Sequence, residues 1–411
     1  MNNIWDGAWY SVMVGLTTSF MGVYLLALGG SDNMLGLLSS LPALVTLLAQ
    51  FPAAMITERR ASRLAVVVPF GLAFRFGYLL FALIPFLPIP AVYRAWLFVL
   101  LLSLINFPGT VSGVAWTAMM GDIFPGQLRG RIFSDRNMLL GIVQLSATLL
   151  AGPLLDRLPY PYNFSLIFSL SFVALLISTR YLRRIAERPA IEALPKAGRR
   201  GSALQWRGIG AALRDRGFLM FMLAMFIVHI GFNISNAMWT ILYVRVIGLS
   251  RTFIGLLSVF AQVMSVLSYR WWGRLGDRLG YRLALFISIL GFVPQPWLHS
   301  FVRTAWPLVP LSLLSGFTGA GFNLILFNAL LGLSPDESTR PSYIAVFNTA
   351  INLTACLAPV IGVAIYQAAG MSVVFNLASS LRLLGLLFLV WKVGLREPTE
   401  RKGKAVRTQE A

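Results

Sequence analysis

The sequence contains twelve long apolar runs, and their repetition limits the fold more than any other feature. A helix needs about 20 consecutive apolar residues to cross the hydrocarbon core of a bilayer. Buried helices of soluble proteins rarely reach that length so many times in one chain. We therefore expect an all-α integral membrane protein with twelve transmembrane helices, at residues 8–28, 34–56, 64–87, 91–120, 135–155, 163–183, 217–246, 250–271, 282–302, 305–331, 343–369 and 371–394.

The composition agrees with a membrane protein. Of the 411 residues, 57% are hydrophobic and only 12% are charged, whereas about a quarter of a soluble chain is charged. The first run has no basic leader, and the one charged residue before it is Asp6. We therefore expect this run to be a permanent span and not a cleaved signal peptide.

Positive charge is divided unevenly between the connections. The even-numbered connections and the C-terminal tail hold 27 of the 34 Lys and Arg, the odd-numbered connections hold five, and Arg75 and Arg382 lie inside runs. An excess of Lys and Arg in short connections marks the cytoplasmic side, so we expect both termini to be cytoplasmic in a cell (inner) membrane. A protein that reads nucleic acid gathers its basic residues on one face or arm, so the net charge of +19 does not indicate a nucleic-acid partner.

Cysteine and histidine are too rare to form a metal site. The chain has one cysteine, Cys356, and two histidines, His229 and His299, whereas a Cys/His site needs a cluster of ligands. A lone cysteine also cannot form an internal disulfide. We expect no metal and no other cofactor. We also do not expect an enzyme, because lipid chemistry would need a cluster of His, Asp or Glu at the interface.

The two halves of the chain repeat each other. Shifting residues 31–65 by 219 positions aligns them without a gap with residues 250–284, and Glu58-Arg59 then meets Asp277-Arg278. Two six-span halves with repeated charges in their connections are typical of secondary transporters. The expected organisation is a first bundle at 1–183, a cytoplasmic connection at 184–216, a second bundle at 217–394 and a cytoplasmic tail at 395–411.

The segment "GRLGDRLGYR", residues 273–282, resembles a loop motif of the major facilitator superfamily, Gly-x-x-x-Asp-Arg-x-Gly-x-Arg/Lys. The resemblance extends over the whole chain in span number, predicted topology and motif position. It implies two pseudo-symmetric six-helix bundles that transport a solute by alternating access. It also implies that the first and fourth spans of each half line the central cavity.

The resemblance implies a cytoplasmic charge latch that holds the two halves together while the site faces outward. An acidic residue of this motif can accept hydrogen bonds at a neighbouring helix N-terminus, and the glycines permit a sharp turn. Plain positive-inside charge is the alternative. The first half departs from the motif because alanines replace its glycines. The candidate latch residues are Gly273, Asp277, Arg278, Gly280 and Arg282 in the second half, with Glu58, Arg59, Arg63, Asp122 and Arg129 in the first.

A polar stripe follows one face of the seventh span at helical spacing: His229, Asn233, Asn236, Thr240 and Tyr243. Lipid cannot satisfy such groups, so they should line a cavity or form hydrogen bonds between helices. His229 is also a candidate for proton coupling, because the ordinary pKa of histidine lies near neutrality, although a structural histidine is the alternative. Further cavity candidates are Tyr10, Thr17, Tyr24, Trp116, Gln262 and Asn323.

Two arginines, Arg75 and Arg382, lie near the middle of their spans. An intramembrane charge is costly and therefore suggests a function. Spans 3 and 12 are peripheral in the superfamily, however, and no carboxylate is expected at matching depth. Snorkelling or hydrogen bonding to backbone carbonyls is an equal alternative.

All 15 acidic residues lie at the ends of runs, in connections or in the tails. A proton-coupled exporter of cations usually needs a buried carboxylate, so we expect a small, neutral or anionic and fairly apolar solute. Efflux is favoured because exporters of the superfamily commonly have twelve spans and short connections. An uptake permease and a non-transporting sensor with the same fold remain open. We expect a monomer in the lipid bilayer, with a proton as a candidate coupling ion.

Overall fold

The structure is a computed structural model that describes residues 2–58, 60, 62–123, 126–185, 208–333 and 339–394. Every regular element within these residues is a helix. Twelve segments of this part of the chain are long and apolar enough to cross a membrane. Their bounds lie close to the predicted runs, which confirms the all-α, twelve-helix prediction. The largest differences are at the eighth span, which continues to Leu279 and not to residue 271, and at the first span, which begins at Asn2 and not at residue 8.

The first half builds six spans from nine elements. Spans 1 and 3 are each assembled from more than one element, and the other four spans are single helices. The elements are α1 (Asn2–Thr17), η1 (Thr18–Phe20), α2 (Met21–Ala27), α3 (Asp32–Glu58), α4 (Leu64–Leu83), η2 (Ile84–Phe86), α5 (Ala91–Ile123), α6 (Gly126–Arg157) and α7 (Tyr162–Leu182).

The second half builds spans 7 to 12, and spans 7 and 9 are the interrupted ones. Its elements are α9 (Arg216–Asn233), α10 (Asn236–Ile241), η3 (Leu242–Val246), α11 (Arg251–Leu279), α12 (Tyr281–Phe292), α13 (Pro294–Ser300), α14 (Leu308–Leu333), α15 (Arg340–Ala369) and α16 (Met371–Val393). Most of the predicted central connection and the predicted tail, at 186–207 and 395–411, lie outside the described residues.

The first span of each half is interrupted at nearly the same repeat position. Span 1 changes from α1 to η1 after Thr17, whose hydroxyl donates to the Met13 carbonyl at 2.8 Å. Span 7 breaks at Ser235, whose hydroxyl donates to the Phe232 carbonyl at 3.2 Å. Hydroxyl groups that bond back to the preceding turn bend helices. With the offset of 219, Ser235 corresponds to Leu16, so the two breaks are one residue apart.

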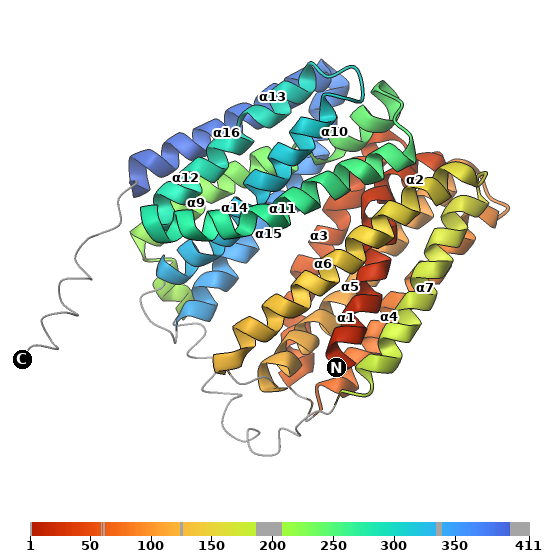
Figure 1. Cartoon of the computed structure of the whole chain (residues 1–411), viewed down its shortest axis with the longest axis horizontal. Helices are drawn as coiled ribbons and strands as arrows, with labels where there is room; N and C mark the ends of the chain where they lie inside the picture. Colours follow the sequence, from red (N-terminus) through yellow and green to blue (C-terminus); the bar gives the residue numbers. More distant parts are fainter. Residues whose placement is uncertain are drawn as a thin grey trace, which may run out of the picture.

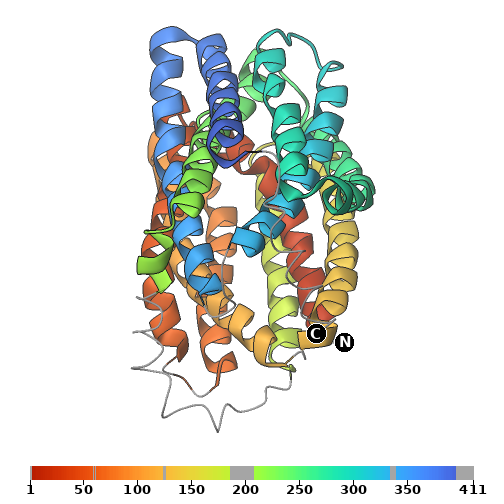
Figure 2. The ribbon, with the colours of Figure 1, turned by 90° about the vertical axis from the view of Figure 1, so that its left-hand side faces the viewer.

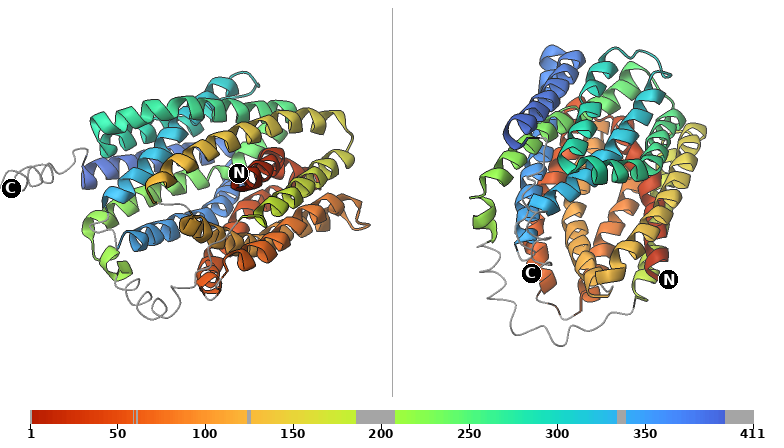
Figure 3. Two further views of the ribbon diagram at one scale, coloured as in Figure 1. Left: turned by 60° about the horizontal axis from the view of Figure 1, so that its bottom comes forward. Right: turned by 60° about the vertical axis from the view of Figure 1, so that its left-hand side comes forward.

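The helices of the two halves form two groups that stand side by side with their axes roughly aligned (Figures 1 and 2). The groups meet where α15 packs against α3 and where α11 packs against α6, and both views of Figure 3 show α11 beside α6. We call the side on which α1 begins the terminus side and the opposite side the far side.

The apolar core differs between these two sides. Toward the far side one buried cluster joins both halves, and it includes Tyr24 and Phe98 from the first half with Met238 and Phe375 from the second. Toward the terminus side each half has its own cluster, around Met119 in the first half and around Trp272 in the second. The halves are therefore packed together at the far side and have separate cores at the terminus side.

Candidate functional site: a charged cavity in the first half

A cavity of about 810 Å³ lies toward the terminus side of the first half. Most of its lining comes from helices α1, α4, α5 and α6. One residue each comes from α3 (Thr46), from α7 (Leu182) and, in the second half, from α11 (Gln262). Its polar and charged lining comprises Asp6, Tyr10, Ser11, Thr46, Arg75, Asn106, Thr110, Ser112, Trp116, Thr117, Arg136, Asn137, Gln144 and Gln262.

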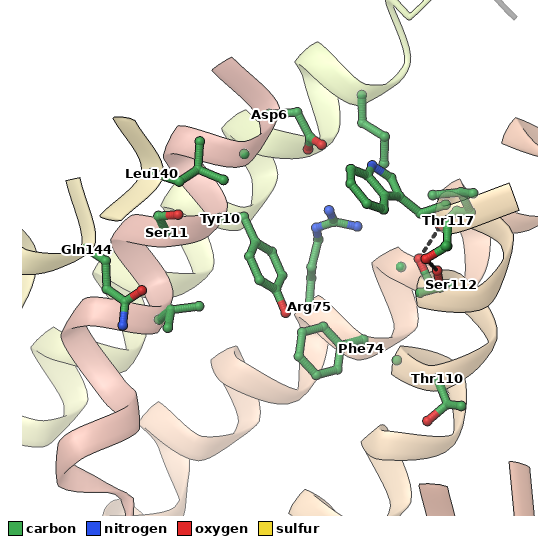
Figure 4. Close-up of a pocket in the computed structure, with 18 of the residues that line it drawn as sticks. Asp6, Tyr10, Ser11, Phe74, Arg75, Thr110, Ser112, Thr117, Leu140 and Gln144 are labelled. Carbon is green, nitrogen blue, oxygen red and sulfur yellow. Dashed lines mark hydrogen bonds between the residues drawn. The ribbon is translucent and has the colours of Figure 1, made fainter. Parts of the chain in front are cut away.

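A hydrogen-bonded chain connects the intramembrane arginine of α4 with the first turns of α1. The Nη2 of Arg75 donates to the Ser178 hydroxyl at 3.2 Å, and this hydroxyl donates to Oδ1 of Asp6 at 2.7 Å. Arg75 and Asp6 are only 5% and 6% exposed, so both charges are held away from bulk water. In Figure 4 the guanidinium of Arg75 points into the cavity between Asp6 and Ser112. The serine therefore links a buried cation to a buried anion.

A second buried arginine, Arg136 of α6, lies on the other side of Asp6. Its guanidinium stands over the Trp116 ring at 5.0 Å, and its Nε donates to the Asn3 carbonyl at 3.4 Å. Each cavity arginine lies against a glycine, because a Cβ on Gly7 would collide with Arg136 and a Cβ on Gly71 with Arg75. The two glycines leave the space that the guanidinium groups occupy.

Arg75 is connected to a carboxylate, although none was expected at its depth in the membrane. Asp6 precedes the predicted first run, but α1 begins at Asn2 and places Asp6 inside the protein. The long arginine side chain then reaches toward the terminus side, where Ser178 completes the connection. The presence of Asp6 in the cavity also removes the argument that a buried carboxylate is missing. An acidic residue only two positions before an apolar run was the signal that could have revealed it.

Arg382 of α16 has a different environment, although it is equally buried. Its Nε donates to the Gly231 carbonyl at 3.2 Å and its Nη1 to the Phe292 carbonyl at 2.9 Å. The guanidinium also lies 4.5 Å from the centre of the Phe232 ring. The residue four positions after Phe292 is Pro296, which has no N–H with which to continue the helix. The backbone-carbonyl alternative therefore describes Arg382.

The polar stripe of span 7 lies at helix contacts and does not line this cavity. Asn233 donates to the Thr354 hydroxyl of α15 at 2.9 Å, and Asn236 to the Ser39 hydroxyl of α3 at 3.1 Å. Thr240 packs on Gly22, where a Cβ would lie 2.6 Å from its hydroxyl. Hydrogen bonding between helices therefore accounts for the two asparagines in this conformation.

The remaining two members of the stripe are packed among apolar groups. Nδ1 of His229 lies 2.7 Å from the Met225 carbonyl oxygen of its own helix, and its ring contacts Phe232, Phe322 and Phe347. Tyr243 packs against the apolar clusters of the far side. These surroundings favour the structural interpretation of His229.

The other cavity candidates divide into two groups. Tyr10, Trp116 and Gln262 line the cavity. Thr17 and Tyr24 are buried in the core, and the Tyr24 hydroxyl donates to the Phe81 carbonyl at 2.6 Å. Asn323 is exposed on α14, away from the cavity lining.

At the far side, charged groups join the two halves. Asp156, in the last turn of α6, accepts hydrogen bonds from the first amides of α11, those of Arg251 at 3.0 Å and Thr252 at 2.8 Å. The Thr252 hydroxyl donates to the same carboxylate at 2.6 Å. An anion is favoured at a helix N-terminus by the free N–H groups and the dipole. The close approach of α6 to the start of α11 depends on Gly152, because a Cβ there would lie 2.6 Å from the Thr252 Cα.

A second ion pair closes the same side. Arg245 of the second half lies 3.1 Å from Asp32 at the start of α3 and donates to the Gly30 carbonyl at 3.2 Å. Asp32 and Asp156 are the two acidic residues that the sequence places at the far side. Both bind an arginine of the opposite half. We call the contacts of Asp32 and Asp156 with the second half the far-side clasp.

The second-half latch candidates lie at the junction of α11 and α12, on the terminus side. Gly280 has φ of +80° and makes the turn, as predicted, whereas Gly273 is inside α11 with open space where a Cβ would be. The prediction of a turn or close approach at Gly273 is therefore wrong in this conformation, since the helix continues to Leu279. Asp277 and Arg278 are exposed. No ion pair of Asp277 with another described residue is found, and Arg282 is half-buried.

The first-half latch candidates are described only in part. Arg63 precedes α4, and its Nη1 donates to the Thr57 carbonyl. Arg59 and the side chains of Glu58, Asp122 and Arg129 lie outside the described residues. No group of three or more metal-ligating side chains occurs in the part of the chain that the structure covers.

The sequence matches the Major Facilitator Superfamily over residues 8–267 and 221–410. Similar solved structures include the nucleoside transporter NupG, with a TM-score of 0.72 at 12% identity over 95% of this chain and 98% of that chain. A mutant form of NupG gives 0.74 at 12% identity with the same coverage. A D-xylose-proton symporter gives 0.69 at 13% identity over 95% of both chains. These identities support likeness of fold. None of the curated proteins is a significant match to this sequence.

Proposed function

Because the chain belongs to the major facilitator superfamily, we propose that it is a secondary active transporter that moves a small, fairly apolar, neutral or anionic solute by alternating access. The observation that carries the proposal is the asymmetry of the two sides. A charged cavity of about 810 Å³ lies toward the terminus side, whereas the far-side clasp and a shared apolar core join the halves at the other side. The protein is therefore closed on the far side of this cavity. Alternating access requires that a solute site be closed on one side of the membrane at a time.

The proposal includes the orientation of the chain in the membrane. The even-numbered connections and the tail hold most of the Lys and Arg in the sequence, which supports cytoplasmic termini in the cell (inner) membrane. The described conformation is then the inward-facing one. Exposed latch residues on that side fit this assignment, because the latch closes the cytoplasmic side only while the cavity faces outward.

The experiment that tests transport is a crosslink across the far-side clasp. In a Cys356→Ala background, Asp156→Cys and Thr252→Cys are combined, and the protein is reconstituted into liposomes. Solutes are first selected by a thermal-shift panel at two pH values, and counterflow of a labelled hit is then measured. Oxidation or a short thiol crosslinker should stop counterflow, and cleavage of the crosslink should restore it.

Each single-cysteine variant is the matched control and should be insensitive to the same treatment. A solute that binds but shows no counterflow in the uncrosslinked protein would support the sensor alternative. Direction is measured in everted vesicles, and we propose export on the ground of the short connections. Uptake is the alternative direction, and the similar solved structures include a nucleoside transporter and a D-xylose-proton symporter.

A further inference from the structure

The two membrane-buried arginines differ in how many of their donors are used. Arg382 donates to two carbonyls and, at 3.4 Å, to the Ser235 hydroxyl, and it lies on an aromatic ring. Arg75 makes one hydrogen bond to the described residues, from Nη2 to Ser178, and its Nε is buried without a partner among them. A buried cation with unused donors is costly. Every nitrogen of Arg382 is therefore engaged, whereas Arg75 engages one of its three and retains more hydrogen-bonding capacity beside the cavity.

The charges of the described cavity lining favour an anion. Two guanidinium groups, those of Arg75 and Arg136, face one carboxylate, that of Asp6. Asp6 already accepts a hydrogen bond from Ser178 and interacts with the Trp116 side chain. Because two cations oppose one engaged carboxylate, the described charges leave a net positive site.

The walls beside Arg75 are aromatic. Tyr10 is 41% exposed because it faces the cavity, and Figure 4 shows it between Asp6 and Phe74, next to Arg75. Trp116 forms another part of the lining. Small-molecule sites commonly enclose about 300–1,000 Å³ with apolar walls and few polar groups, and the volume of about 810 Å³ is in that range.

We infer that the cavity takes an organic anion, whose carboxylate or comparable acidic group pairs with Arg75 while its aromatic or apolar body lies among Tyr10, Phe74 and Trp116. The inference rests on the proposed function, because the cavity is taken to be the transport site. A carboxylate matches the paired donors of a guanidinium in two parallel hydrogen bonds. The neutral amide of the same body cannot replace it, because it brings no charge.

The test compares three probes that share one ring system and differ in charge: indole-3-acetate, indole-3-acetamide and tryptamine. A second series, benzoate, benzamide and benzylamine, controls for the choice of ring. Purified full-length protein in detergent is titrated with each probe at pH 7, and Kd and thermal shift are recorded. In at least one series the anion should bind at least tenfold more tightly than its neutral and cationic counterparts.

Arg75→Gln should weaken anion binding at least tenfold and leave binding of the neutral amide unchanged. Arg75→Lys should retain part of the preference for the anion, and it keeps the test decisive if the glutamine variant does not fold. The matched control is Arg180→Gln, which removes an exposed arginine of α7 that does not line the cavity. It should change the anion Kd less than threefold.

The inference is overturned if no carboxylate stabilises the protein, if the amide or amine binds as tightly as the acid, or if Arg75→Gln keeps the wild-type Kd. Proteoliposome assays separate this failure from failure of the proposed function. An anion that binds through Arg75 without counterflow contradicts transport alone. Counterflow of a neutral or cationic solute that is unchanged in Arg75→Gln contradicts the anion site alone.

Discussion

The two halves use a buried arginine in opposite ways. In the first half Arg75 lines a cavity and is connected to a carboxylate through one hydroxyl. In the second half Arg382 is enclosed by backbone carbonyls and an aromatic ring. Their exposures of 5% and 3% are almost equal. Burial therefore does not separate a structural arginine from a candidate binding residue, whereas the number of donors already used does.

The internal repeat explains the position of neither arginine. Spans 6 and 12 begin at Tyr162 and Met371, an offset of 209, and Arg382 then corresponds to Val173. By the offset of 219, Arg75 corresponds to Pro294. Each buried arginine therefore belongs to one half alone.

The largest expected effect is a difference in protein stability between variants of the two arginines. Arg382→Leu should lower the free energy of unfolding by about 2–6 kcal/mol, because two buried carbonyls lose their donor at about 1–3 kcal/mol each. Arg75→Leu should leave thermal stability within about 1 kcal/mol of wild type, because it removes one serine contact and a poorly satisfied buried charge, and Arg136 remains as a cation beside Asp6. Thermal unfolding in detergent measures both. If both substitutions lowered the stability equally, the distinction between a structural Arg382 and a solute-binding Arg75 would not hold.

The next effect compares the latch candidates of the two halves. Asp277→Asn should reduce transport about tenfold or more without affecting membrane insertion. In the latch the carboxylate would accept hydrogen bonds at a helix N-terminus, and loss of its charge there should cost about 1–2 kcal/mol. Glu58→Gln should have a smaller effect because the first-half motif lacks its glycines. Initial rates in proteoliposomes give the comparison. Wild-type turnover in Asp277→Asn would show that this residue is not part of a latch.

Weakening the far-side clasp should have a moderate effect on the balance between the two conformations. Asp156→Ala removes three hydrogen bonds and an ion pair with α11, and at this partly exposed site we expect a cost of about 1–2 kcal/mol. Such a change shifts the balance between conformations about tenfold. Labelling of a cysteine placed at Ser19, which bonds Ser258 across the halves at 3.0 Å, should become faster from the far side. Asp32→Ala, which removes the other pair, should act in the same direction.

A smaller effect tests how Arg75 is positioned. Gly71→Ala places a methyl group against the Arg75 guanidinium, and displacing the end of this side chain should cost about 1 kcal/mol, or about fivefold in anion affinity. Gly113→Ala is the control, because it lines the same cavity and a Cβ there meets nothing within 4 Å. Identical Kd values for the two variants would argue against a role for the Arg75 position.

The smallest effect concerns His229. Since its ring packs among three phenylalanines and lies beside its own helix backbone, His229→Gln should lower stability by about 1 kcal/mol through lost aromatic contacts. The pH dependence of transport should not move. A shifted pH profile with unchanged stability would instead identify the histidine as a coupling group.

By itself, the sequence determined the span number, the repeat and the expected sidedness. These properties depend on apolar length and on loop charge, which are local along the chain. The turn at Gly280 could also be predicted, because one residue type suits a positive φ. The polar stripe of span 7 was equally visible, but helical periodicity shows only which residues share a face and not what that face contacts.

The tertiary structure alone decided which polar groups meet. Asp6, Arg75 and Ser178 come from spans 1, 3 and 6, and no periodicity connects them. Likewise, Arg382 finds carbonyls on spans 7 and 9. The free energy of a buried charge depends on neighbours that are distant in sequence, so the same arginine can act as a structural brace in one bundle and as a candidate solute-binding group in the other.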